Sequence, residues 1–242
     1  MPLDTSTLAA ALLITGAAGI VRGVTGFGGA MVMSPPLALL LGPRLTVPVV
    51  LVLESVVAAP MLLHTRTLVN WRLMGVILLV ACLCVPLGTL ILVSLEPQFM
   101  RRAIALSVIV FALILLIGWR YSGRPRLSTS VGLAALSGTM LGATSIGGPP
   151  VILYLLSGPD PVAVTRANLT LYVTVASVVG LAALWYHRVL DIPAATTSLW
   201  LAPAYFFGLI AGTRVFPRLS DTRFRQLTLL LLIVVSTGIL VA

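Results

Sequence analysis

Apolar segments long enough to cross a lipid bilayer recur along this chain. A bilayer core of about 30 Å requires about 20 helical residues. Three such segments lie in the first half and three in the second: residues 45–63, 73–95, 103–119, 167–186, 192–213 and 226–242. Short arginine-containing stretches separate them. The pattern predicts an all-α, polytopic membrane protein.

Each half opens with two shorter apolar pieces around a glycine-rich break. The breaks are residues 22–29 and 141–148, and the flanking pieces are residues 8–21, 29–42, 129–141 and 148–157. Pieces of this length suit half-membrane helices, so each pair predicts a glycine-broken hairpin that enters the bilayer and returns. Two strongly tilted full spans are the alternative. Irregular backbone at membrane depth is tolerated where it lines a cavity, so the breaks are expected to mark a binding site.

The two halves also match in sequence. A shift of 119 positions pairs Gly19 with Gly138, Gly23 with Gly142, Thr25 with Thr144, Gly28 with Gly147 and Gly29 with Gly148, and a shift of 124 pairs Gly88 with Gly212. We therefore predict one transmembrane domain with a first repeat (1–119), a cytoplasmic linker (120–127) and a second repeat (128–242). The alternative is weak self-similarity of apolar helices, with glycines that only allow close helix contact.

The composition leaves no room for a soluble catalytic domain. Hydrophobic residues make up 59% of the chain, charged residues 9%, and the mean hydropathy is +1.14. All fifteen basic residues are arginines, and most lie between apolar spans, so the net charge of +9 reports topology and predicts no nucleic-acid partner. The absence of lysine excludes the Walker A lysine of a P-loop.

Arginines in the loops predict the orientation of the spans. One side collects ten: Arg66, Arg72, Arg120, Arg124, Arg126, Arg166, Arg214, Arg218, Arg223 and Arg225. The other side collects four: Arg44, Arg101, Arg102 and Arg188. Basic residues in short loops favour the cytoplasm, so the side with ten arginines is predicted to be cytoplasmic and both termini to face outward. An odd number of crossings in each half would make the second repeat inverted.

At the two breaks the chain resembles the sulfite exporter TauE/SafE family of bacterial and archaeal membrane proteins. The strings that carry the likeness are Gly19-xxx-Gly23-xx-Gly26-Phe27-Gly28-Gly29 and Gly138-xxx-Gly142-xx-Ser145-Ile146-Gly147-Gly148-Pro149-Pro150. The resemblance implies secondary transport, commonly efflux, of small sulfur-containing anions such as sulfite, thiosulfate or organosulfonates. It also implies a location in the cytoplasmic (inner) membrane.

The glycine breaks predict a cradle for an anion. A helix N-terminus offers unpaired N–H groups and about half a positive charge, and glycine lets an oxyanion approach the backbone. We expect the second helix of each hairpin to begin at these glycines, with hydroxyl donors at the same level. The predicted substrate-binding residues at the breaks are Thr25, Gly26, Gly28, Gly29, Thr144, Ser145, Gly147 and Gly148.

Three polar residues in or near apolar segments extend the predicted site. Arg22 is the one basic residue directly beside a break, and it either binds substrate or reaches a water interface; the second half has Leu141 at the matching position. Glu54 lies well inside an apolar span and is predicted to couple protons, to pair with Arg22, or to make a structural polar contact. Asn168 is predicted to contact substrate or to hydrogen-bond a neighbouring helix.

Four classes of function compete: a secondary transporter, a passive anion channel, an intramembrane enzyme and a structural subunit. An enzyme would need paired carboxylates, a histidine cluster or a metal set at membrane depth, and the sequence offers none. A structural subunit would not need two glycine breaks. The sequence thus favours an anion carrier that requires no cofactor and no metal, is coupled to protons, and has a channel for small oxyanions or carboxylates as its alternative.

Overall fold

A computed structural model describes residues 4–26, 28–118, 127–156, 160–215, 229–230, 232–234 and 236–240. Within these ranges the chain is helical and has no strand. The helices are α1 (Thr5–Thr25), α2 (Gly29–Leu41), α3 (Pro43–Thr65), α4 (Trp71–Ser94), α5 (Pro97–Ile117), α6 (Leu127–Thr144), α7 (Gly148–Leu156), α8 (Val162–Tyr186) and α9 (Ile192–Val215), with a 3-10 turn, η1, at Arg66–Leu68. The all-α prediction is confirmed.

Six helices in the described part are long and apolar enough to cross a membrane: α1, α3, α4, α5, α8 and α9. Five of them coincide with predicted spans. The sixth predicted span, 226–242, is helical where it is described. The predicted linker lies outside the described residues except for Leu127, which begins α6.

Helix α1 is longer than the half-membrane piece predicted for residues 8–21. Asp4 caps its first turn by accepting a hydrogen bond from the Thr7 backbone N–H at 3.4 Å, so the polar residues ahead of the apolar piece are helical too. The returning arms are short, with 13 residues in α2 and 9 in α7. The hairpins therefore have unequal arms.

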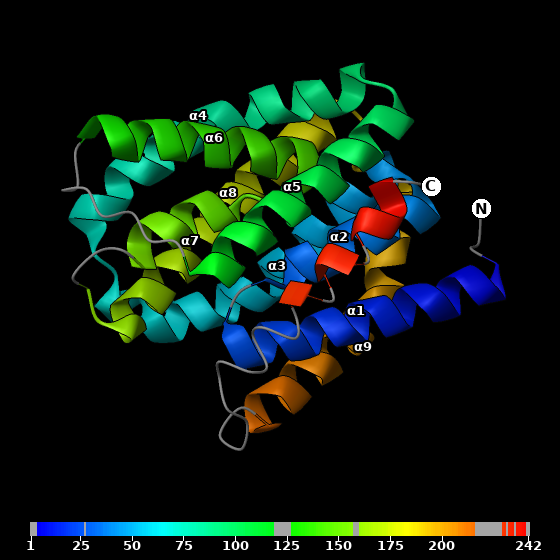
Figure 1. Ribbon diagram of the computed structural model, residues 1–242, viewed down its shortest axis with the longest axis horizontal. Coiled ribbons are helices and arrows are strands. Elements are labelled where there is room, and N and C mark those ends of the chain that lie inside the picture. The colour runs from blue at the N-terminus through cyan, green and yellow to red at the C-terminus, as the bar shows by residue number, and fades with distance from the viewer. Residues whose placement is uncertain are drawn as a thin grey trace.

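Two close helix pairs form the flanks of the molecule. Figure 1 shows α1 beside α9 at one flank and α4 beside α6 at the other, with the remaining labelled helices between them. Each pair joins a helix of the first half to a helix of the second. The halves are interleaved in this way, so neither half forms a separate bundle.

Glycines bring the backbones of both pairs into contact. A Cβ atom added to Gly19 or Gly23 of α1 would collide with the carbonyl oxygens of Tyr205 and Leu209 in α9. In the other pair, Gly138 and Gly142 of α6 lie against the carbonyl oxygens of Ala81 and Val85 in α4. The two sets of contacts are related by the sequence shifts: adding 119 to the glycine positions of α1 gives those of α6, and subtracting 124 from the contacted positions of α9 gives those of α4. The aligned glycines therefore serve close helix contact, and the two interfaces match residue by residue.

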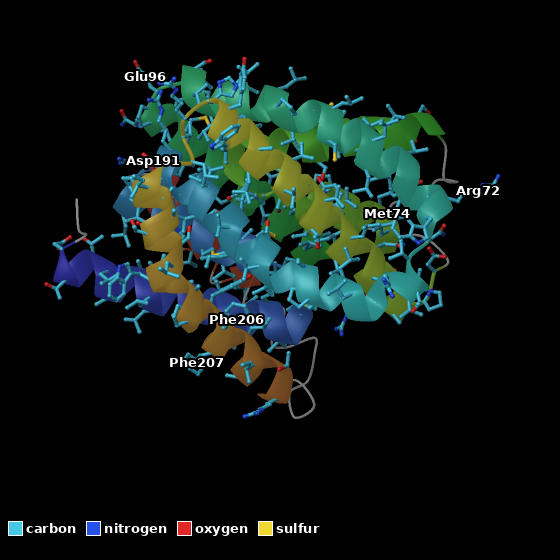
Figure 2. The ribbon with its side chains drawn as sticks, turned by 180° about the vertical axis from the view of Figure 1, so that it is seen from behind. Arg72, Met74, Glu96, Asp191, Phe206 and Phe207 are labelled. Carbon is cyan, nitrogen blue, oxygen red and sulfur yellow. The ribbon has the colours of Figure 1, made fainter. Side chains whose placement is uncertain are left out.

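The outer surface is apolar, as expected for a protein surrounded by lipid. Leu79, Leu83, Leu199 and Phe207 are between 65 and 75% exposed. Figure 2 shows Arg72 at one end of the bundle and Glu96 and Asp191 at the other. Arg72 therefore lies at the opposite end of the bundle from Glu96 and Asp191.

Replacing Gly138 by Val should destabilise the α4–α6 pair by about 1–3 kcal/mol, because the added side chain has no space beside the Ala81 carbonyl. Gly132→Val is the matched control, since Gly132 lies in the same helix with no neighbour within 4 Å of an added Cβ. Thermal unfolding in detergent measures the difference. Equal melting temperatures for the two variants would contradict the packing role of Gly138.

Candidate functional site

Both hairpins turn with the same local geometry. Helix α1 ends at Gly26, which has a left-handed φ of 77° and donates its N–H to the Arg22 carbonyl at 2.8 Å. Helix α6 ends in the same way at Ser145, with φ of 61° and an N–H donated to the Leu141 carbonyl at 2.9 Å. A serine in this conformation is uncommon, because the region favours glycine. Ser145 therefore marks a site where backbone and side chain are both constrained.

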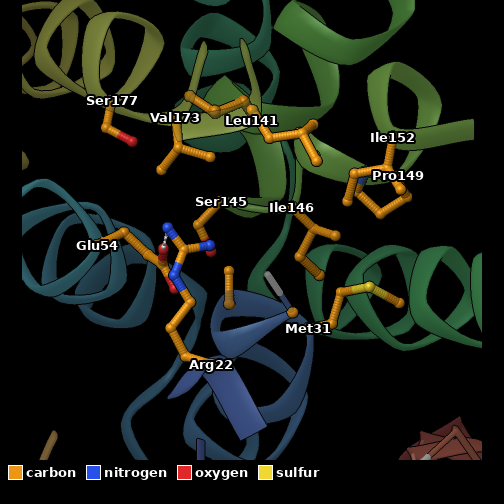
Figure 3. A pocket seen from close by; sticks show the side chains of 15 residues that line it. Arg22, Met31, Glu54, Leu141, Ser145, Ile146, Pro149, Ile152, Val173 and Ser177 are labelled. Carbon is orange, nitrogen blue, oxygen red and sulfur yellow. Dashed lines mark ion pairs between the residues drawn. The ribbon is translucent and has the colours of Figure 1, made fainter. Parts of the chain in front are cut away.

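A cavity lies between the two breaks (Figure 3). Its lining comprises Arg22, Gly28, Ala30, Met31, Glu54, Leu141, Ser145, Ile146, Gly147, Gly148, Pro149, Ile152, Leu169, Val173 and Ser177. The volume of this cavity that water can occupy is about 40 Å³. One water needs about 10–15 Å³ by this measure, so the cavity has room for about three waters or a small polyatomic ion.

Arg22 and Glu54 meet in this cavity. The Arg22 Nη2 atom lies 3.4 Å from Glu54 Oε2, and each residue is only 3% exposed. Figure 3 shows the Arg22 side chain extending from α1 into the space bounded by Glu54, Ser145 and Ile146. Of the alternatives for Glu54, the structure places it as the partner of Arg22, and the buried position of Arg22 differs from that of an arginine at a water interface.

Tyr205 of α9 completes this cluster, which we call the ionic cluster: Arg22, Glu54 and Tyr205. The fully buried Tyr205 donates its hydroxyl proton to Glu54 Oε1 at 2.6 Å. Gly29 makes the contact possible, because a Cβ there would lie 2.6 Å from Glu54 Oε1 and would also strike the Tyr205 hydroxyl. The glycine at the start of α2 is thus required for close approach of side chains.

The guanidinium of Arg22 is incompletely satisfied by the described residues. Its Nε and Nη2 atoms are buried and have no hydrogen-bond partner there, although Nη2 is within ion-pair distance of Glu54. A buried donor without an acceptor costs about 1–3 kcal/mol, and more when it is charged. The cavity therefore contains a positive group with N–H donors that are free to form hydrogen bonds to an anion.

The family model described as Sulfite exporter TauE/SafE matches residues 11–239. The chain belongs to the sulfite exporter TauE/SafE family. Neither the search of curated proteins nor that of solved structures gave a match. As a TauE/SafE member, the chain is a multi-pass membrane protein of a transporter family and not of an enzyme family, with a small anion as its substrate class.

The cavity of this TauE/SafE protein includes part of the predicted substrate-binding set. Arg22, Gly28, Ser145, Gly147 and Gly148 line it, together with Glu54. Helices α2 and α7 begin at Gly29 and Gly148, as expected. The lining does not include Thr25, Gly26, Gly29, Thr144 or Asn168.

The hydroxyl groups near the breaks make local hydrogen bonds. Thr25 donates to the Val21 carbonyl at 2.8 Å, and Thr144 donates to the Met140 carbonyl at 2.7 Å. Ser145 donates to the Thr144 carbonyl at 2.5 Å, and its hydroxyl also lies 2.7 Å from that of Ser34 in α2. Ser145 thus joins the second break to the first hairpin.

Asn168 lies away from the cavity and connects two helices. It is fully buried, and its Oδ1 accepts the backbone N–H of Asn70 at 2.9 Å. Asn70 in turn caps α4 by accepting the Leu73 N–H at 3.3 Å. Of the two predicted roles for Asn168, the structure contains the interhelical hydrogen bond.

Sequence reasoning missed Tyr205 and Ser177. Tyr205 lies near the middle of α9, and a tyrosine hydroxyl buried at membrane depth needs a partner. That signal indicates a polar contact without naming the partner.

Among the described residues, no group of three or more His, Cys, Asp or Glu side chains comes together to hold a metal ion.

Removing one member of the Arg22–Glu54 pair should cost more stability than removing both. Arg22→Met leaves a buried carboxylate, for which about 3–5 kcal/mol is expected. Adding Glu54→Gln should recover part of that loss, because the double variant has no unpaired charge. Unfolding free energies of both single variants and the double variant in mixed detergent micelles measure the coupling. Additive losses would contradict the ion pair.

Proposed function

We propose that this protein is a secondary transporter that exports sulfite or a related small sulfur-containing oxyanion by alternating access. The observation that carries the proposal is the buried guanidinium of Arg22, which lines a cavity between the two hairpin breaks and has N–H groups without an acceptor in the described chain. A positive group at membrane depth is costly, so its position indicates a function for it.

The surroundings of Arg22 suit an anion with several oxygens. The backbone at Gly28, Gly147 and Gly148 borders the cavity where α2 and α7 begin, and helix starts favour negative charge. The Ser145 and Ser177 side chains add polar groups to an otherwise mainly apolar lining. This donor set fits an oxyanion better than a neutral or cationic molecule.

The size of the cavity favours the smaller candidate substrates. Space for about three waters suits the four heavy atoms of sulfite, whereas thiosulfate and organosulfonates would require the lining to move apart. We therefore place sulfite ahead of the bulkier anions for this conformation.

The matching interfaces support an inverted-repeat mechanism. Residues 1–119 and 128–242 would form the two repeats, with 120–127 as a cytoplasmic linker. Glycine contacts that match between α1–α9 and α4–α6 give the molecule two equivalent interfaces, as expected for repeats related by symmetry. We propose an orientation in the cytoplasmic membrane with both termini outside, from the arginine distribution.

Protons are the proposed coupling ions, with Glu54 as the coupling group. Among the described residues, Glu54 is the one acidic residue in the cavity lining, and it contacts Arg22, the one basic residue there. A carboxylate buried beside the substrate site can link anion movement to proton movement when its ionisation changes during the cycle.

Purified protein in liposomes should give saturable flux of labelled sulfite that increases with an imposed pH gradient and accelerates several-fold with sulfite on the opposite side. Arg22→Met should lose this flux, while Arg102→Met, which alters an exposed arginine outside the cavity, should retain it. Flux that rises linearly and lacks acceleration would support a passive anion channel. Flux equal to that of empty liposomes would contradict the sulfite assignment.

Single cysteines should report the proposed orientation. In a variant with Cys82 and Cys84 replaced by Ala, Glu96→Cys should react in intact cells with a membrane-impermeant maleimide, whereas Arg72→Cys should react only after permeabilisation. These positions lie at opposite ends of the bundle (Figure 2). The reverse pattern would place both termini in the cytoplasm.

A further inference from the structure

One guanidinium serves both an internal carboxylate and, under the proposed function, the transported anion. Arg22 is the only basic residue in the cavity lining within the part of the chain that the structure describes, and Glu54 is within ion-pair distance of it. We propose that Glu54 is an internal counter-ion that the substrate displaces from Arg22, that Glu54 takes up one proton for each anion bound, and that Tyr205 is the positioning residue for its carboxyl group. This inference rests on the proposed anion transport.

Charge balance in a buried site favours displacement over joint binding. With Glu54 ionised, the pair is neutral, and an added monoanion would leave one uncompensated negative charge among apolar side chains such as Met31 and Ile146. With Glu54 protonated, Arg22 and the monoanion form a neutral pair instead. The carboxylate and the anion therefore compete for the same positive group.

The contact between Arg22 and Glu54 is suited to exchange. Arg22 Nη2 and Glu54 Oε2 are 3.4 Å apart and form an ion pair. They form no hydrogen bond, since Nη2 has no hydrogen-bond partner in the described chain. A tight arginine–carboxylate pair would use two short parallel hydrogen bonds. Because those bonds are missing, an oxyanion can gain hydrogen bonds at Nε and Nη2 that Glu54 does not supply.

Tyr205 contacts the oxygen of Glu54 that is not paired with Arg22. Its hydroxyl donates to Oε1 at 2.6 Å, while Oε2 is the atom close to Arg22. A proton from water can therefore add to Oε2 while the Tyr205 hydrogen bond to Oε1 persists. When the anion leaves, Oε2 releases the proton to water and the ion pair with Arg22 forms again.

The elements around Glu54 supply few other charged or titratable groups. Helix α1 contributes Arg22 and α9 contributes Tyr205, whereas α2 has no titratable side chain. On α8, the Tyr172 hydroxyl lies 2.7 Å from the Ser137 hydroxyl, and Arg166 is an exposed residue near Gly26. The arginines of α5, Arg101 and Arg102, lie outside the cavity lining. Glu54 is thus the group expected to set the pH dependence of binding.

The positions related to this cluster by the repeat hold no second copy of it. The shift of 119 places Leu141 opposite Arg22, and the shift of 124 places Ala81 opposite Tyr205. Because Leu141 lines the same cavity, one charged exchange site serves both halves. One proton bound and released together with each anion is the expected stoichiometry.

The test compares sulfite binding to detergent-purified protein and to the Glu54→Gln variant between pH 5.5 and 8. Sulfite itself titrates in this range, but that effect is common to both proteins and cancels in the ratio of their Kd values. The Kd of the unmodified protein relative to that of Glu54→Gln should rise with pH and approach about tenfold per pH unit, the slope for one linked proton. Adding Arg22→Met to the unmodified protein or to Glu54→Gln should abolish sulfite binding in both cases.

Tyr205→Phe separates positioning from packing. It should keep the affinity at low pH and move the rise of the Kd ratio to higher pH, because the ionised carboxylate loses a hydrogen-bond donor. Tyr154→Phe is the matched control, since Tyr154 is also buried and within 2.6 Å of a serine hydroxyl, that of Ser130, but lies outside the cavity lining. Its profile should equal that of the unmodified protein.

The outcomes distinguish the two proposals. A constant Kd ratio across pH, with sulfite bound by both proteins, would overturn the counter-ion role and leave anion transport standing. A Tyr205→Phe profile identical to that of Tyr154→Phe would overturn the role of Tyr205. No sulfite binding at any pH, by either the unmodified protein or Glu54→Gln, would overturn the proposed function and this inference together.

Discussion

A guanidinium and a carboxylate buried at membrane depth place the strongest constraint on this molecule. Neither charge is stable there alone, so three helices must bring Arg22, Glu54 and Tyr205 together. The start of α2 must also come close, which only a residue without a side chain allows at Gly29. The cluster therefore constrains the position of the first hairpin and the shape of the cavity.

The scaffold is repeated while the chemistry is not. Glycine contacts fix α1 to α9 and α4 to α6 at corresponding residues, and both hairpins turn through a left-handed residue whose N–H donates four residues back. Charged groups occupy the cavity from the first half alone, with Leu141 where the second half would carry its arginine. A symmetric frame with one charged site is compatible with a transporter that binds one small anion at a time.

The two breaks contribute in different ways. At the first break, Gly29 provides room for side chains of α3 and α9. At the second, Ser145 reaches Ser34 in the opposite hairpin, and the Ser137 hydroxyl donates to the Gly147 carbonyl while lying beside Tyr172. Polar groups freed by the interrupted helices are thus largely satisfied from neighbouring helices, as required where water is scarce. Arg22 lines the cavity, and part of its donor capacity has no acceptor in the described chain.

The sequence by itself determined the features that depend on local physics. Five predicted spans are helices because apolar segments of this length form their hydrogen bonds internally in lipid. Helices α2 and α7 begin at the predicted glycines because glycine residues interrupt the preceding helices there. Only the tertiary structure decided which polar groups meet. Tyr205 and Glu54 are 151 residues apart, and Asn168 proved to hold the start of α4 while Arg22 faced the cavity. Hydropathy predicts which residues lie within the bilayer, whereas the packing of the helices determines which polar side chains contact one another.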